Sequence, residues 1–193
     1  MSQELYPEHR EQAIDEFTAE RLQSYYLQHP EITRPGFRLQ KEARELLDAQ
    51  RYGPSLVFAA SAAEQFLKAA LLRPVIYGLV HIEPLAEMVV ESALSQTGYL
   101  RYTKLLSGLF SALTTVDLRV LVRTGGSKPL LEEASELQTR RNAVIHRGED
   151  VSEKEAITGL AVSASVYTYI LAEMLSALGL ERSNLGLVQR AQA

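Results

Sequence analysis

Residues 55–72 read SLVFAASAAEQFLKAALL, and this stretch predicts the central helix of a helical bundle. Apolar and small side chains occupy nearly every side of it, whereas a helix at the protein surface carries a single apolar stripe. We therefore expect other helices to pack closely around this segment. Glu64 and Lys68 interrupt the apolar run four residues apart, which places both on one face of the helix and predicts an ion pair. Alternatively, the Glu64 carboxylate belongs to a functional site.

Helix-forming residues with apolar side chains at a helical period predict further helices on both sides of this segment. Prolines and glycines separate them, and TGGSKP at 124–129 is the strongest predicted loop. Pro74 and Gly78 are expected to interrupt the chain just after the central helix. No stretch of useful length alternates apolar and polar residues, so no strand is predicted, and the predicted fold is all-α, a bundle of about six to seven helices. The predicted helices span residues 8–28, 37–51, 54–72, 83–96, 99–113, 129–147 and 153–178.

The chain length predicts one compact domain, because 193 residues suffice to bury a core without disulfides or metals. Within it, residues 1–50 are expected to form an N-terminal helical extension packed on a bundle made by residues 51–193. The sequence contains no cysteine, which excludes disulfides, thiolate nucleophiles and cysteine-based zinc sites. A chain without cysteine suits a reducing cytoplasm.

The sequence predicts neither a secretory signal nor a membrane-spanning helix. The first residues, MSQELYPEHREQ, carry acids and lack the apolar core of a secretory signal. Residues 157–172 are the least charged stretch, but they are short for a membrane span and contain several hydroxyl side chains. We interpret them as a buried helix of the bundle, and we expect a soluble, cytoplasmic protein with no membrane contact.

Positive charge is concentrated in one part of an acidic chain. The formal net charge is −4, yet residues 99–147 hold 8 bases and 4 acids. One interpretation is ordinary variation on solvated helix faces. The other is a local surface that attracts phosphate groups, which an acidic protein can also carry.

Several kinds of active site are excluded by the motifs that are missing. The GGSK sequence at 125–128 lacks the first glycine of a phosphate-binding loop, and Pro129 stands where a serine or threonine would bind magnesium. No GxGxxG follows a strand, no GxSxG is present, and the four histidines have no metal-ligand spacing. We therefore expect no metal and no cofactor.

The remaining chemistry lies in residues 137–156, LQTRRNAVIHRGEDVSEKEA, at the end of the predicted helix 129–147. At about 100° per residue, Asn142 and His146 share one face, whereas Arg141 and His146 are about 140° apart. Arg141 and His146 can converge only if the helix distorts near His146 or if two copies of the helix face each other. A structural alternative is that Asn142 and His146 satisfy each other and buried backbone groups, while Arg147 interacts with the helix dipole.

Local signals define the turn after this helix. Gly148 is expected to end the helix, because glycine adopts the left-handed conformation that follows many helix ends. Ser152 and Glu155 have the spacing of a capping box, which opens a last long helix. Small residues in that helix, such as Gly159 and Ser163, would allow another helix to approach closely, either within the bundle or across a dimer.

These residues resemble the HEPN superfamily. Arg141 to His146, RNAVIH, is similar to the Arg-polar-x3-His signature of that superfamily, and the turn, serine cap and long helix that follow are similar to many prokaryotic members. Residues 59–72, AASAAEQFLKAALL, resemble its central helix, which often carries Glu followed by Lys. The likeness covers about residues 53–180. It implies a helical bundle that dimerises, and active members are metal-independent endoribonucleases, often toxins or anti-phage effectors.

The resemblance also implies roles for individual residues at a cleft where the motifs of two subunits meet. Arg141 would stabilise the phosphate, His146 would act as the acid and base, and Asn142 would orient His146 or the phosphate. Arg140, which could replace Arg141 in register, and Arg147 would contact the RNA substrate. The expected partners are RNA, a second copy of the chain and an antitoxin protein. A non-catalytic HEPN-like module that binds nucleotides, RNA or a protein partner is the alternative, and an unrelated helical scaffold is a third.

Overall fold

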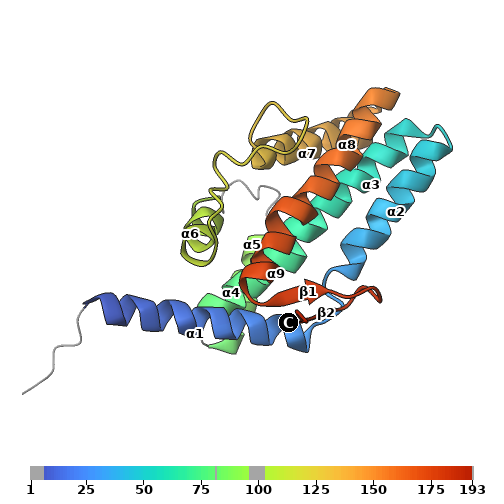
Figure 1. The fold of residues 1–193 in the computed structure, drawn as a ribbon. Coiled ribbons are helices and arrows are strands. Elements are labelled where there is room, and N and C mark those ends of the chain that lie inside the picture. Colours follow the sequence, from blue (N-terminus) through green and yellow to red (C-terminus); the bar gives the residue numbers. More distant parts are fainter. Residues whose placement is uncertain (1–6, 81, 96–102, 193) are drawn as a thin grey trace, which may run out of the picture.

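A computed structural model describes residues 7–80, 82–95 and 103–192, and it confirms the all-α prediction (Figure 1). The helices are α1 (Pro7–Gln28), α2 (Arg34–Asp48), α3 (Tyr52–Gln65), η1 (Phe66–Leu72), α4 (Arg73–Leu79), α5 (Glu83–Ser95), α6 (Thr103–Leu113), α7 (Leu130–Arg147), α8 (Glu153–Val166), η3 (Tyr167–Leu171) and α9 (Ala172–Ala177). The strands are β1 (Leu180–Arg182) and β2 (Val188–Arg190). The first residues of the helix predicted for 99–113 lie outside the described residues.

The central helix is confirmed and is longer than the sequence predicts. α3, η1 and α4 run on without a break as one helix, Tyr52–Leu79, and α2, α7 and α8 pack around its first part. The small side chains expected there are buried, among them Ala59, Ala60, Ala62 and Ala63. Such residues let neighbouring helices approach closely, which explains why this segment forms the middle of the bundle.

The expected interruption at Pro74 is wrong, because the helix continues through it. Proline has no N–H and cannot bond the carbonyl four residues earlier, which here belongs to Ala70. The buried hydroxyl of Tyr26, on α1, donates to that carbonyl oxygen at 2.7 Å. The turns before Pro74 also widen into a π-helix over η1, an adjustment that lets a helix absorb such a disturbance.

Residues at the start of the chain pack on this central helix. α2 lies along α3, and Gly36 in its first turn permits the approach, since an added Cβ would lie 2.3 Å from Cε1 of the buried Phe66. α1 crosses the lower end of the bundle and packs against α4 (Figure 1). Residues 17–48 thus contribute to the same core as the rest of the chain.

The last long helix, α8–η3–α9, begins at the predicted capping box. The Ser152 hydroxyl accepts from the Glu155 N–H, and the Glu155 carboxylate accepts from the Ser152 N–H. By length and composition, two helices are capable of crossing a membrane: Tyr52–Leu79 and Glu153–Ala177. Their apolar windows are 67% and 44% buried inside the bundle. Since core helices of soluble proteins share these properties, the two helices are weak evidence for a membrane span.

A small antiparallel hairpin at the C-terminus contradicts the prediction that the chain has no strands. β1 pairs with β2 in the register Leu180 to Arg190, and Gly186 adopts φ 78° in the connection. The hairpin is joined to the turn between α1 and α2, because the Val188 N–H donates to the Pro30 carbonyl at 2.8 Å. Strands of three residues are too short to produce an alternating pattern, so the sequence carries no signal for them.

Candidate functional site

The candidate motif lies on the C-terminal half of α7, which stays a regular α-helix through Arg147. Gly148 caps the helix with φ 65°, and its N–H donates to the Val144 carbonyl at 3.1 Å, as the sequence predicts. His146 and Arg147 occupy the last turn, where the negative end of the helix dipole favours cations. A distortion of the helix that would bring His146 toward Arg141 is therefore absent from α7.

Arg141 faces the central helix and forms a cluster there with the two residues singled out in it. Its Nη1 lies 2.5 Å from Glu64 Oε2, and Lys68 Nζ lies 2.8 Å from Glu64 Oε1, which confirms the predicted Glu64–Lys68 pair. The side chains of Arg141, Glu64 and Lys68 are 20%, 21% and 11% exposed. We call this cluster the Glu64 triad.

The two cations of the triad keep the Glu64 carboxyl ionised inside the bundle. Burial favours the neutral carboxyl of Glu64, but the hydrogen bonds and charges of Lys68 and Arg141 outweigh burial and hold its pKa below the ordinary value. One carboxylate therefore binds two cations. The Arg141 Nε–H is buried and, in the described part of the chain, has no acceptor.

His146 and Asn142 lie on another side of α7. His146 is exposed at the helix end, and Asn142 is partly buried one turn earlier on the same face. Within the described ranges no hydrogen bond involves the side chain of either residue, so the structural alternative, in which they satisfy each other, is not observed. Because α7 is regular, the structure does not bring His146 and Arg141 together within one chain.

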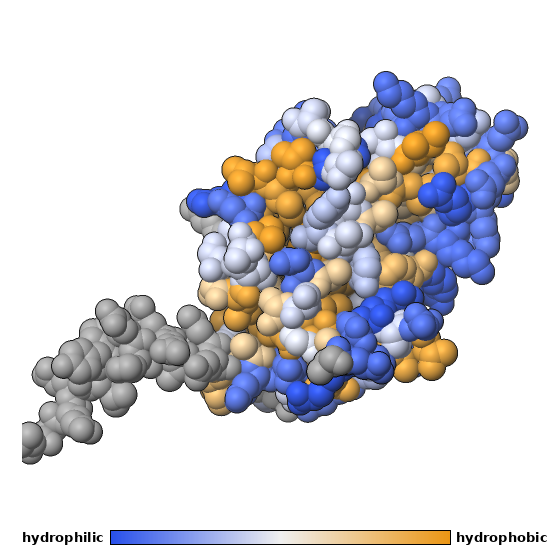
Figure 2. Space-filling view, in the orientation of Figure 1, coloured by the Kyte–Doolittle hydropathy of each residue, from blue (hydrophilic) through white to orange (hydrophobic). Residues whose placement is uncertain are grey.

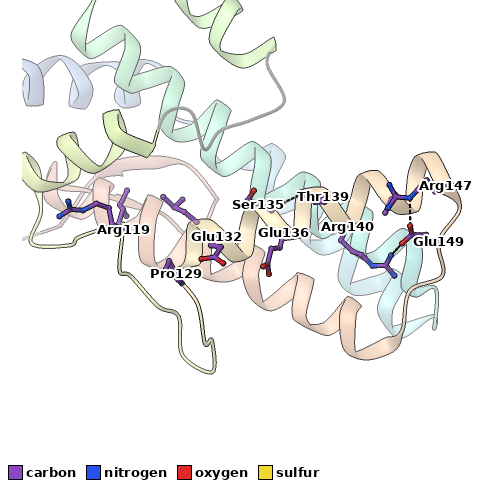
Figure 3. A pocket seen from close by; sticks show the side chains of 12 residues that line it. Arg119, Pro129, Glu132, Ser135, Glu136, Thr139, Arg140, Arg147 and Glu149 are labelled. Atoms are coloured by element: carbon purple, nitrogen blue, oxygen red, sulfur yellow. Dashed lines mark hydrogen bonds and ion pairs between the residues drawn. The ribbon is translucent and has the colours of Figure 1, made fainter.

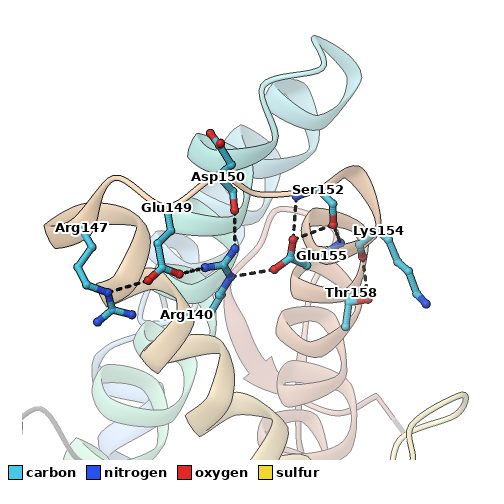
Figure 4. A network of polar contacts seen from close by, with 8 residues as sticks. All are labelled: Arg140, Arg147, Glu149, Asp150, Ser152, Lys154, Glu155 and Thr158. Carbon is cyan, nitrogen blue, oxygen red and sulfur yellow. Dashed lines mark hydrogen bonds and ion pairs between the residues drawn. The ribbon is translucent and has the colours of Figure 1, made fainter.

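Arg140 and Arg147 organise the turn between α7 and α8 (Figure 4). Arg140 Nε lies 2.8 Å from Glu155 Oε1, and its other nitrogens donate to the Glu149 carboxylate and the Asp150 carbonyl. Arg147 Nε lies 2.7 Å from Glu149. Hydrogen bonds from the Ser152 N–H, the Ser152 hydroxyl and Arg140 lower the pKa of Glu155 to about 2. Both arginines therefore form ion pairs with carboxylates of the turn. Arg140 does not contact Glu64, which is the partner of Arg141.

Bases of the block at residues 99–147 also form ion pairs with carboxylates. Arg123 Nε lies 2.8 Å from Glu133, Arg119 pairs with Asp117, and Lys128 pairs with Glu136. Together with the pairs of Arg140, Arg141 and Arg147, these contacts cover every base of the block whose side chain the structure describes. The ion pairs argue against a broad phosphate-attracting surface over this block.

A groove of about 720 Å³ runs along the outer side of α7 (Figure 3). Hydrophobic surface gathers nearby, over the segment between α6 and α7, where Val120 and Val122 are exposed (Figure 2). Arg141 and His146 do not line this groove. Its charged side chains balance: Arg119, Arg140, Arg147, Glu132, Glu136 and Glu149. The groove is therefore not a basic cleft around the motif.

Metal-ligating side chains do not cluster in the described part of the chain, where no group of three His, Asp or Glu residues could hold an ion. No protein-family model, curated protein or solved structure matches the chain. Function is therefore inferred from the residues of the chain and their geometry.

Proposed function

We propose that this chain is a HEPN-like, metal-independent endoribonuclease of a toxin or defence type, whose active site is completed by a second copy. The observation that carries the proposal is the end of α7, where an exposed His146 stands on the same helix as Arg141, which belongs to the partly buried Glu64 triad. A purely structural cluster gains little from buried charge, because apolar residues of similar size stabilise a core at least as well.

The geometry of α7 supports a site that two copies build together. The two side chains project about 140° apart on a regular helix, so one chain cannot direct both at one phosphate. Two copies related by a two-fold axis would set the Arg141 of each near the His146 of the other. Ile145, beside His146, is 53% exposed, and an apolar side chain at that place gains stability when a second copy covers it.

The chemistry then needs only groups that the two copies supply. His146 of one copy removes the proton from a ribose 2′-OH, and the oxygen attacks the phosphorus beside Arg141 of the second copy. The bond to the 5′ oxygen breaks as the same His146, now protonated, gives its proton to that oxygen. The products are a 2′,3′-cyclic phosphate and a free 5′-OH. The planar guanidinium of Arg141 stabilises the charge on the phosphorane, and Asn142 orients His146.

A non-catalytic HEPN-like module that holds RNA, a nucleotide or a protein partner is the second candidate. The ion pairs of Arg140, Arg141 and Arg147 favour the protein-partner form of this candidate, since bases already engaged by carboxylates are less free to bind phosphate. In this case the end of α7 serves as a docking surface, for example for an antitoxin.

The nuclease and the non-catalytic module predict different results in an RNA cleavage assay. The full chain is incubated in EDTA with single-stranded and structured RNAs, beside the His146→Ala and Arg141→Ala variants. Arg190→Ala, which removes an exposed arginine from β2, is the matched control. We expect cleavage that leaves 2′,3′-cyclic phosphate ends and falls about 10²–10⁴-fold in His146→Ala. The rate per chain should also fall on dilution below the dissociation constant of the dimer.

Intact RNA with folded, dimeric wild-type protein would overturn the nuclease proposal and support the docking module. Cleavage that His146→Ala retains would reject this histidine as the acid and base. Dimerisation is measured in parallel by light scattering, so that loss of activity through dissociation is separated from loss of a catalytic group.

A further inference from the structure

Two adjoining hollows share four of their lining residues, and residues of α1, the start of α2, η1, α4 and α5 line them. Figure 1 shows α1 and α4 together at one end of the bundle. The volumes of the two hollows are about 880 Å³ and 500 Å³, within the range of small-molecule sites. They share the side chains of Tyr25, Gln28, His29 and Arg73. We call the pair the Tyr25–Arg73 hollow. The motif on α7 contributes no residue to it.

Aromatic rings form one wall of this hollow. The ring of Tyr25 lies between two others, with its centroid 4.4 Å from that of His29 and 4.9 Å from that of Tyr77. Tyr25 and Tyr77 are partly buried, which fixes their planes, whereas His29 is exposed at the end of α1. The rings are tilted to one another by 44° and 31°, so they offer separate aromatic faces, and an exposed face such as that of His29 can stack on a planar base.

Guanidinium groups also line the hollow. Arg38 of α2 and Arg73 of α4 line the larger hollow, and in the described part of the chain neither has a carboxylate within ion-pair distance. Burial raises the pKa of Tyr25, although the nearby charge of Arg73 opposes the rise. The phenol therefore stays neutral and leaves the charge of Arg73 intact. Both cations therefore remain available to an anion.

The carboxylates nearby do not cancel this charge. Glu31 lines the larger hollow but is held by Arg34 at 2.6 Å, and Glu87 lines only the smaller one. The first turn of α2 adds to the positive potential, because it contains no acid and its Thr33 cap makes no side-chain hydrogen bond to the helix N–H groups. The larger hollow thus combines aromatic faces with two unpaired guanidinium groups.

We propose that the Tyr25–Arg73 hollow binds a nucleotide, with the base stacked against His29 and Tyr25 and the phosphate held by Arg38 and Arg73. The ligand is a phosphorylated nucleoside, either free or as one residue of a single-stranded RNA. Gln28, which offers both a donor and an acceptor, lines both hollows and is placed to bond the edge of the base. This site is separate from the end of α7 and does not depend on the nuclease proposal.

The fold explains why this arrangement forms. The close contact of Gly36 with Phe66 sets the first turn of α2 against the central helix, and the helix that continues through Pro74 carries Arg73 and Tyr77 up to α1. Residues from three separate stretches of sequence therefore meet in one hollow, which no local motif could reveal.

Isothermal titration of the full chain tests the proposal with four probes: AMP, adenosine, inorganic phosphate and a short single-stranded oligoadenylate. The oligonucleotide is used with the His146→Ala background so that it cannot be cleaved during the titration. The variants are Arg38→Ala, Arg73→Ala and His29→Ala. Arg44→Ala is the matched control, because it removes an exposed arginine from the same helix α2 without touching the hollow.

We expect AMP to bind and each arginine variant to weaken it about 10-fold or more, since a hydrogen bond to a charged group contributes about 1.5–3 kcal/mol. Adenosine and phosphate alone should each bind more weakly than AMP, and Arg44→Ala should bind AMP like the wild type. An oligonucleotide that binds at least 10-fold more tightly than AMP identifies an RNA strand as the source, and equal affinity identifies a free nucleotide. No binding of AMP or RNA, or binding that the arginine and His29 variants leave unchanged, would overturn the proposal.

Discussion

Replacing Gly36 with alanine tests the contact that sets α2 against the central helix. The added Cβ would lie 2.3 Å from Phe66 Cε1 and 2.7 Å from Cδ1, whereas carbon atoms in contact lie about 3.5–4.0 Å apart. Phe66 is fully buried, and its ring centroid lies 5.2 Å from that of Phe37 and 5.4 Å from that of Tyr167. The ring therefore cannot yield without moving its neighbours.

The expected change in the free energy of unfolding combines two opposing contributions. Inserting one methyl group into a packed core costs about 1–3 kcal/mol. Alanine regains up to about 1 kcal/mol over glycine through its higher helix propensity. We therefore expect Gly36→Ala to lower the free energy of unfolding by about 1–2 kcal/mol, which corresponds to a fall of about 2–8 °C in Tm for a chain of this length.

Urea unfolding followed by far-UV circular dichroism measures this change. Gly108→Ala in α6 is the control, because its Cβ meets nothing within 4 Å and the substitution should leave stability equal or higher. Phe66→Leu removes the clashing ring atoms, so the double variant should lose at least about 1 kcal/mol less than the two single variants added together. A Gly36→Ala protein as stable as the wild type, or strictly additive effects, would refute the proposed contact.

Three further predictions concern local features. Tyr26→Phe should destabilise the chain by about 1–3 kcal/mol in thermal unfolding, because it removes the hydroxyl that donates to the buried Ala70 carbonyl before the helical proline; an unchanged Tm would contradict this. Gly148→Ala should lower the free energy of unfolding by about 1–2 kcal/mol, because the backbone at φ 65° is strained for alanine. The space around Gly148 is open, so the added methyl group causes no clash. The folded pKa of Glu155 is about 2 and its ordinary value 4.5, so the stability that it contributes is present above about pH 4.5 and is lost as pH falls toward 2. Wild type should therefore exceed Glu155→Gln in stability at neutral pH and match it near pH 2; a gap that persists at low pH would reject the assignment.

The elements that the sequence predicts well are those encoded within a few residues. A segment without a polar face becomes the central helix, Gly148 ends α7, and Ser152 with Glu155 opens α8. Each signal acts through contacts no more than one or two helical turns apart. Such contacts form whatever the rest of the chain does, and the all-α class could therefore be predicted.

The features that the sequence misses depend on partners far along the chain. Pro74 continues a helix because Tyr26, 44 residues away from Ala70, supplies a hydrogen bond to the carbonyl that proline leaves free. The C-terminal hairpin contains strands of only three residues and is anchored on Pro30. A pattern within a few residues cannot predict either the Tyr26–Ala70 hydrogen bond or the Val188–Pro30 hydrogen bond.

The candidate sites divide in the same way. The sequence by itself determined an all-α chain, a capped helix carrying Arg141 and His146, and the pairing of Glu64 with Lys68. The tertiary structure decided that Arg141 joins that pair, across 77 residues, and that His146 stays apart from it. It also decided that Arg38 and Arg73 line one hollow beside His29. The physical reason is that helices and caps form through neighbouring backbone groups, whereas a site depends on which faces of those helices the core packs together.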